Sequence, residues 1–135
     1  MKRLVVLVLL IAVSAFCEEA YLLKSVSNAL TAGNYQLMSE LVSDDGALIN
    51  LIPDQKKNHT YTSRQSFYLF KIIFDGRETS NVEVVRIKYN KEKNRLQAVL
   101  LWEYTVDEKN FSETLFLLAL RNDDKWKLVE LTGGR

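Results

Sequence analysis

Four apolar segments separated by short polar turns fill the C-terminal half of this 135-residue chain, and they constrain its fold more than any other feature. The segments run over residues 81–89, 95–106, 111–121 and 125–132, and the turns between them are rich in Asn, Asp and Lys. Apolar runs of this length bounded by turn-forming residues predict β-strands. Because the connections are short, neighbouring strands must run antiparallel. The C-terminal half is therefore predicted to form a four-stranded meander.

The N-terminal half predicts a helical hairpin. Apolar residues recur at helical spacing between Tyr21 and Leu30, and Gly33 is expected to end that helix. Asn34 is a suitable N-cap for a second helix, which the turn-forming residues 43–46 would end.

A short strand and a third helix are predicted between the hairpin and the meander. Residues 47–52 have the length and composition of a strand, and residues 54–58 predict a solvated loop. Thr62 or Ser63 is expected to cap a helix that ends at 75–76. The order predicts an α+β fold, α-α-β-α-β-β-β-β, with three helices packed on a strongly curved antiparallel sheet.

The first 17 residues have the pattern of a signal peptide. Lys2 and Arg3 precede an apolar stretch over 4–13, and small residues then allow cleavage after Ala15 or after Cys17. The apolar stretch is shorter than the roughly 20 residues that span a membrane. An uncleaved N-terminal anchor is the alternative. The expected organisation is a signal peptide over 1–17 and one domain over 18–135, secreted or periplasmic.

Cys17 is the only cysteine in the chain, so an intramolecular disulfide is excluded. Anchoring through a lipid on Cys17 is not expected, because Phe16 stands where lipoproteins have a small residue and Ser14 replaces the usual leucine. Stability must then come from the core alone.

The charge of the chain argues against nucleic acid as a partner. Removal of Lys2 and Arg3 with the signal peptide changes the formal net charge from +1 to −1. Binding to nucleic acid requires clustered positive charge, which this composition lacks.

The two middle strands of the predicted meander are apolar on both faces. Residues 98–102 and 115–120 do not alternate with polar residues, as strands of a sheet wetted on one side should. The helices can cover one face. A second subunit, or the curl of the sheet itself, would have to cover the other. A homodimer formed through the sheet and a monomer both remain open at this point.

A family resemblance rests on residues 30–46, which carry Ala-Gly-Asn at 32–34 and Asp-Asp-Gly at 44–46. Followed by a strand, a proline, a capped helix and a meander, this stretch resembles the nuclear transport factor 2-like superfamily of cystatin-like α+β cones. It is similar to the small secreted members that have no assigned function. The resemblance implies a cone that encloses a cavity.

The superfamily includes ketosteroid isomerase, and that comparison argues against catalysis. The resemblance places Val26 at the position of the isomerase's proton-donating tyrosine and Asn50 at that of its proton-shuttling aspartate. A valine has no proton to donate, and an amide cannot act as a general base near neutral pH.

Strand residues that could face the cavity are the candidate ligand-binding residues: Trp102, Glu103, Tyr104, Glu113, Phe116 and Trp126. Aromatic residues on strands also commonly belong to the core. The sequence predicts an exported, non-enzymatic domain that binds a small apolar ligand or a protein partner, such as an envelope protein, through its sheet and cavity. The alternative is an isomerase, dehydratase or hydrolase that uses Glu103 or Glu113. Charged Arg86 and Arg121 also fall within predicted strands.

No metal, cofactor or catalytic residue is predicted. Asp44 and Asp45 have the setting of turn residues, and His59, the only histidine, is expected in a solvated loop. Asn58 and Asn110 head glycosylation triplets in predicted loops, which matter only if the source is eukaryotic.

Overall fold

The computed structural model describes residues 17–51 and 59–134. The predicted signal peptide up to residue 16, the loop 54–58 and Asn58 lie outside the described residues. The described helices are α2 (Cys17–Ala32), α3 (Tyr35–Glu40) and α4 (Ser63–Phe74). The strands are β1 (Ala47–Asn50), β2 (His59–Tyr61), β3 (Glu78–Asn90), β4 (Arg95–Val106), β5 (Lys109–Asn122) and β6 (Lys125–Gly134).

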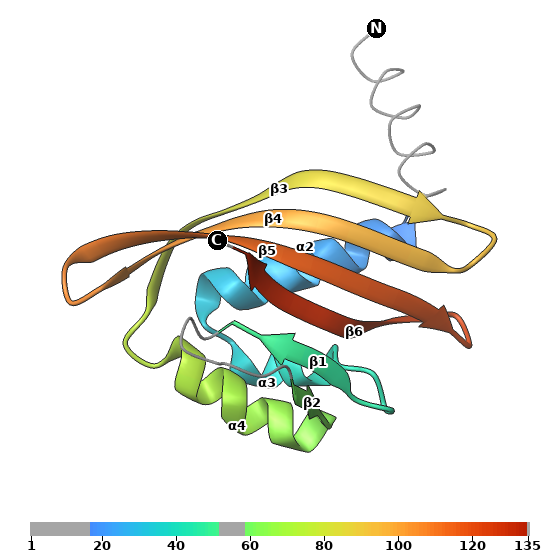
Figure 1. Ribbon diagram of the computed structural model, residues 1–135, viewed down its shortest axis with the longest axis horizontal. Coiled ribbons are helices and arrows are strands. Elements are labelled where there is room, and N and C mark those ends of the chain that lie inside the picture. Colours follow the sequence, from blue (N-terminus) through green and yellow to red (C-terminus); the bar gives the residue numbers. More distant parts are fainter. Residues whose placement is uncertain (1–16, 52–58, 135) are drawn as a thin grey trace, which may run out of the picture.

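The six described strands form one sheet in the order β2-β1-β6-β5-β4-β3. Strand β1 runs parallel to β6, and every other neighbouring pair is antiparallel. The long strands curve together, and the three described helices lie on one side of them (Figure 1). The predicted α+β class and the C-terminal meander are confirmed.

Local chemistry sets the ends of the helices as predicted. Gly33 ends α2 with a positive φ of 64°, a conformation that costs glycine little. The Asn34 side chain accepts a hydrogen bond from the amide of Leu37 at 3.0 Å and caps α3. Thr62 caps α4 in a capping box with Gln65.

The two-residue hairpin turns fix the register of the meander. Asp107 and Glu108 have φ angles of 48° and 66°, and Asp123 and Asp124 have φ angles of 51° and 63°. Two consecutive positive φ angles give a turn whose twist matches that of paired strands, and Asp tolerates this conformation. These two turns join β4 to β5 and β5 to β6 without further loop residues.

Strand β2 was not predicted. His59, expected in a solvated loop, lies exposed in this strand, where it pairs with Ile49 of β1. The His-Thr-Tyr segment has no apolar alternation of its own, so only its pairing with β1 makes it a strand. The loop prediction for Asn110 was also wrong, since it lies exposed in β5 and its side-chain oxygen accepts a hydrogen bond from Thr105 at 3.1 Å.

The core lies between the helices and one face of the sheet. We call this the inner face; β4 and β5 contribute alternate buried residues to it. The inner residues of these strands are Leu96, Ala98, Leu100, Trp102, Tyr104, Leu115, Leu117 and Ala119. They pack with helix residues that include Val26, Leu30, Met38, Phe70 and Ile73. Among the described residues, no helix is both long and apolar enough to cross a membrane.

Candidate functional site

Three of the six candidate binding residues, Trp102, Tyr104 and Glu113, come together on the inner face. Trp102 and Tyr104 are 1% and 4% exposed, and Trp102 lies directly opposite Glu113 across the β4–β5 ladder. The Tyr104 hydroxyl donates a hydrogen bond to Glu113 Oε1 at 2.7 Å. The Arg77 guanidinium lies 5.4 Å from the centre of the Tyr104 ring, and the Phe111 ring stacks on the same tyrosine at 5.6 Å. The structure thus places one half-buried carboxylate in an aromatic cluster.

Burial raises the pKa of Tyr104 above its ordinary value of 10.0. The hydrogen bond to Glu113 and the negative charge of that carboxylate raise it further, while Arg77 acts in the opposite direction. Tyr104 therefore stays protonated and serves as a fixed donor to Glu113.

This shift predicts a loss of stability in alkali. Because folding raises the Tyr104 pKa, the protonated hydroxyl contributes stability below the unfolded value of 10.0, and that contribution is lost as the pH rises through the folded value. Thermal melts followed by circular dichroism between about pH 8 and pH 11 should show a steeper loss for the native chain than for Tyr104→Phe. Equal pH dependence of the two melting temperatures would contradict this assignment.

Glu103 and Phe116 lie on the opposite side of the sheet, which we call the outer face. Glu103 pairs with Ser112 and Phe116 with Val99, so their side chains alternate away from the inner residues. Glu103 and Glu113 are thus on different faces. The two carboxylates cannot act together in one site.

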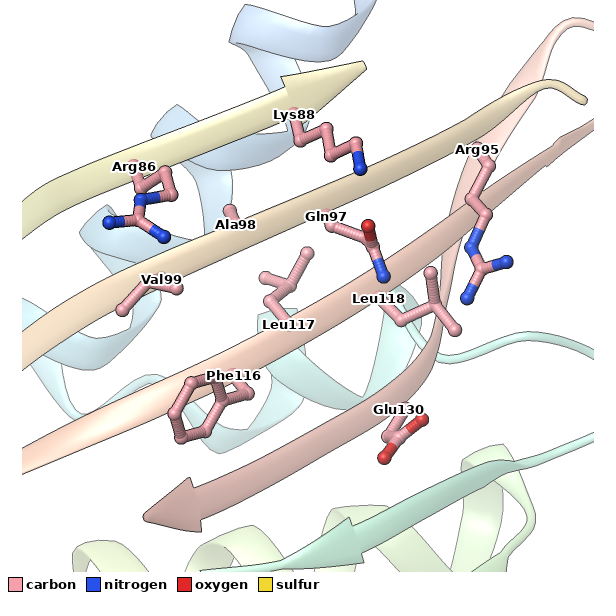
Figure 2. A pocket seen from close by; sticks show the side chains of 10 residues that line it. All are labelled: Arg86, Lys88, Arg95, Gln97, Ala98, Val99, Phe116, Leu117, Leu118 and Glu130. Carbon is pink, nitrogen blue, oxygen red and sulfur yellow. The ribbon is translucent and has the colours of Figure 1, made fainter. Parts of the chain in front are cut away.

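The outer face is hollowed over its centre. A depression of about 320 Å³ is lined by Arg86, Lys88, Arg95, Gln97, Ala98, Val99, Phe116, Leu117, Leu118 and Glu130 (Figure 2). Val99, Phe116 and Leu118 give it an apolar floor, and Phe116 is 47% exposed. No described helix covers this face (Figure 1). β4 and β5 are therefore apolar on both faces, but among the described residues only the inner face is covered.

The charges around this hollow are segregated. Arg86 and Lys88 on β3 and Arg95 on β4 supply positive charge, and Glu130 on β6 supplies the carboxylate at the opposite side (Figure 2). Within residues 17–51 and 59–134, none of the three cations forms an ion pair. The Nε atom of Arg95 is buried without a described hydrogen-bond partner. These cations are available to a carboxylate from another molecule.

Sequence reasoning missed Lys88, Arg95 and Glu130. An available signal was the spacing of two residues between Arg86 and Lys88, which places both side chains on one face of a strand. The other strand arginine that was noted, Arg121, donates to Asp124 at 2.7 Å beside the β5–β6 turn and does not line this hollow.

Trp126, the sixth candidate, lies far from both groups. It is 7% exposed, near the β5–β6 turn, and its ring contacts that of Tyr89 at 5.7 Å.

Comparison with known proteins rests on structure. Searches against protein families and curated proteins found no match to this sequence. A nuclear transport factor 2-like protein of unknown function from Shewanella oneidensis superposes with a TM-score of 0.70 over 90% of this chain and 99% of its own, at 13% identity. The chain has the nuclear transport factor 2-like fold. This confirms the fold expected from residues 30–46.

Other solved proteins with the nuclear transport factor 2-like or cystatin-like arrangement agree. A DUF4783 family protein from Bacteroides uniformis matches with a TM-score of 0.69 and 11% identity, over 83% of this chain and 94% of its own. A domain of unknown function with a cystatin-like fold from Nostoc punctiforme matches with a TM-score of 0.70 and 11% identity, over 88% of this chain and 77% of its own. At these identities the likeness extends to the fold alone.

Proposed function

We propose that this chain is an exported, non-enzymatic binding domain that pairs with a second copy of itself through the outer face of its sheet. The observation that carries the proposal is the exposed apolar centre of that face, with unpaired cations on β3 and β4 and Glu130 on β6. Exposed apolar surface of this kind on one face of a sheet is a feature of interaction sites.

The register of the sheet supports a second copy as the occupant. Lys88, Gln97, Leu118 and Glu130 pair in sequence across four strands and form one row. Consider two copies whose outer faces meet across a two-fold axis. If the axis runs along the strands and is centred between β4 and β5, β3 of one copy lies opposite β6 of the other. Lys88 of each copy then comes opposite Glu130 of its partner, and a wrong alignment would bring like charges together.

The apolar residues of the outer face support the same pairing. In this arrangement β4 of one copy faces β5 of the other, so Val99 and Leu101 meet the strand that carries Phe116 and Leu118. Sheets that pack face to face keep their strands within about 30° of each other, which allows the rows to stay in contact. Pairing would remove the exposed Phe116 ring from water.

A specific observation also favours an enzyme that uses Glu113, as a second candidate function. The Tyr104 hydroxyl holds this carboxylate among aromatic rings on the inner face. The sequence comparison with ketosteroid isomerase offers no further catalytic group, since Val26 and Asn50 occupy the positions that matter. A single carboxylate without a partner acid or base is weaker support than the open outer face.

Export is supported by the basic pair Lys2-Arg3 and the apolar stretch that follows it. One experiment tests export and pairing: native mass spectrometry of the protein recovered outside the cytoplasm after expression of the full chain. We expect a polypeptide that begins at Phe16 or Glu18 and a complex of twice its mass. Absence of the chain outside the cytoplasm contradicts export, and an unprocessed chain found there contradicts cleavage. A strict monomer, with or without a bound small molecule, contradicts pairing.

A further inference from the structure

The hollow on the outer face of the sheet has a charged side and an apolar floor. Arg86 and Lys88 of β3 lie along the charged side, and both residues are exposed. Val99 of β4 and Phe116 and Leu118 of β5 form the floor beside them (Figure 2). The volume of about 320 Å³ falls within the range of small-molecule sites. The hollow therefore offers both kinds of contact that a small amphipathic anion needs.

The register of the strands aligns one cation with the apolar floor. Arg86 pairs with Val99, and Val99 pairs with Phe116, so the three residues form one row across β3, β4 and β5. Neighbouring strands lie about 4.8 Å apart, which separates β3 from β5 by about 10 Å. A carboxylate bound at Arg86 would place an attached alkyl chain over Val99 and against the Phe116 ring, which is 47% exposed.

The proposed pairing of two copies leaves Arg86 without an anion. Its row continues from Phe116 to Thr132 of β6. In the two-fold arrangement this row faces the same row of the other copy, so Arg86 comes opposite Thr132, whereas Lys88 comes opposite Glu130. Among the described residues, Arg86 forms no ion pair. Its charge is therefore available to a small molecule.

The negative charge in the hollow fixes the direction of such a ligand. Glu130 carries the only carboxylate among the described residues that line the hollow, and it lies on β6. Like charges repel, so the head group of a bound anion is favoured on the β3 side. The alkyl chain then extends from β3 toward β5.

We propose that the outer hollow of a single subunit binds a medium-chain alkyl carboxylate, with its head group at Arg86 and its chain over Val99 and Phe116. The chain occupies the surface that β5 of a second copy would cover, so binding and pairing exclude each other. This competition rests on the proposed function, because it requires a pair that can dissociate. The binding site itself requires only one subunit.

Three probes separate the parts of this site in nuclear magnetic resonance titrations of the isotopically labelled protein, purified after expression of the full chain. Octanoate has both the charge and the chain, 1-octanol lacks the charge, and acetate lacks the chain. We expect octanoate to cause saturable shifts of the Val99 and Leu118 methyl resonances. Its affinity should exceed that of octanol by about threefold or more, as for exposed charge pairs. Acetate at the same concentration should leave these resonances in place.

Arg86→Gln is the matched variant, because it keeps a long polar side chain, removes the charge and leaves Lys88 and Glu130 in place. It should lower the affinity for octanoate to that for octanol. Lys93→Gln makes the same change in net charge in the exposed turn between β3 and β4, and it should leave the affinity unchanged. Equal affinities of the native chain for octanoate and octanol, or an equal loss in both variants, would overturn the site.

Sedimentation equilibrium at constant ionic strength tests the competition. With octanoate at about ten times its dissociation constant, the dissociation constant of the pair should rise about a hundredfold, because both released subunits are stabilised by the ligand. A pair whose constant does not change would overturn the competition. A chain that stays monomeric at every concentration and still binds octanoate through Arg86 supports this site and contradicts the proposed pairing.

Discussion

Replacing Trp102 by alanine is expected to lower the free energy of unfolding by about 3–5 kcal/mol, as for other large buried aromatic residues. Its side chain is 1% exposed and packs against the rings of Phe74 and Tyr104, at 6.1 and 4.5 Å between centres. Its indole N–H donates to Thr79, whose hydroxyl in turn donates to the backbone oxygen of Leu30 in α2. The substitution removes packing and the indole donor to Thr79 Oγ1, while the bond from Thr79 to Leu30 remains.

Two variants separate these contributions in urea unfolding at one protein concentration. Trp102→Phe keeps most of the ring contacts and loses the hydrogen bond, so it should cost less than alanine. Tyr68→Ala removes an aromatic ring that is 56% exposed on α4, and it should change the free energy by no more than about 0.5 kcal/mol.

The stability of Trp102→Ala decides whether Trp102 is a core residue or a ligand-binding residue. If Trp102 lined an open cavity, its removal would cost little stability and would mainly alter binding. A loss of less than about 1 kcal/mol would therefore contradict its place in the core. The expected larger loss would place Trp102 in the core and leave the half-buried Glu113 as the inner candidate that can contact a ligand.

The parts of the fold that were predictable are those set by local chemistry. Gly33, Asn34 and Thr62 act within a few residues of themselves, so their effect on helix ends can be inferred from the sequence. The turn predicted over 107–110 lies at the right place but holds only Asp107 and Glu108, and this shorter turn fixes which residues of β4 and β5 oppose each other. The approach of Tyr104 to Glu113 follows from that register.

The faces of β3 and β6 could not be predicted, because irregular pairing with their neighbours breaks the alternation. The register shifts between Val84 and Arg86, so Val84 turns inward while Arg86 and Lys88 turn outward, although all three have even numbers. A second shift lies between Leu118 and Ala119, next to the position that pairs with Glu130. The charges of the outer hollow depend on both shifts. Their arrangement became visible only in three dimensions.

The strand predicted over 47–52 is confirmed as β1 (Ala47–Asn50), whereas β2 was unpredictable for a different reason. Strand β1 pairs parallel with β6, more than seventy residues later in the chain, and β2 exists only because β1 offers it an edge. The three-residue segment of β2 has no periodic pattern of its own that would indicate this pairing.

Reversing the charge of Lys88 or of Glu130 should weaken the proposed pair of subunits, and reversing both should restore it. Lys88→Glu alone brings two carboxylates together at each of the two equivalent contacts, and Glu130→Lys alone brings two cations together. We expect each single variant to raise the dissociation constant by about tenfold or more, which corresponds to about 1.4 kcal/mol. The double variant again places opposite charges across the interface, so its constant should return to within about threefold of the native value.

Lys93→Glu is the matched control, because it makes the same change in net charge in the exposed turn between β3 and β4. Sedimentation equilibrium at low ionic strength is the measurement, since added salt screens charges of this kind. Additive weakening in the double variant would mean that Lys88 and Glu130 do not meet across the two-fold axis, whereas rescue requires that they do. Rescue in the double variant, with an unchanged dissociation constant for Lys93→Glu, would establish both the contact and the orientation of the two sheets. One substitution can compensate for the other only if the rows that carry Lys88 and Glu130 face each other.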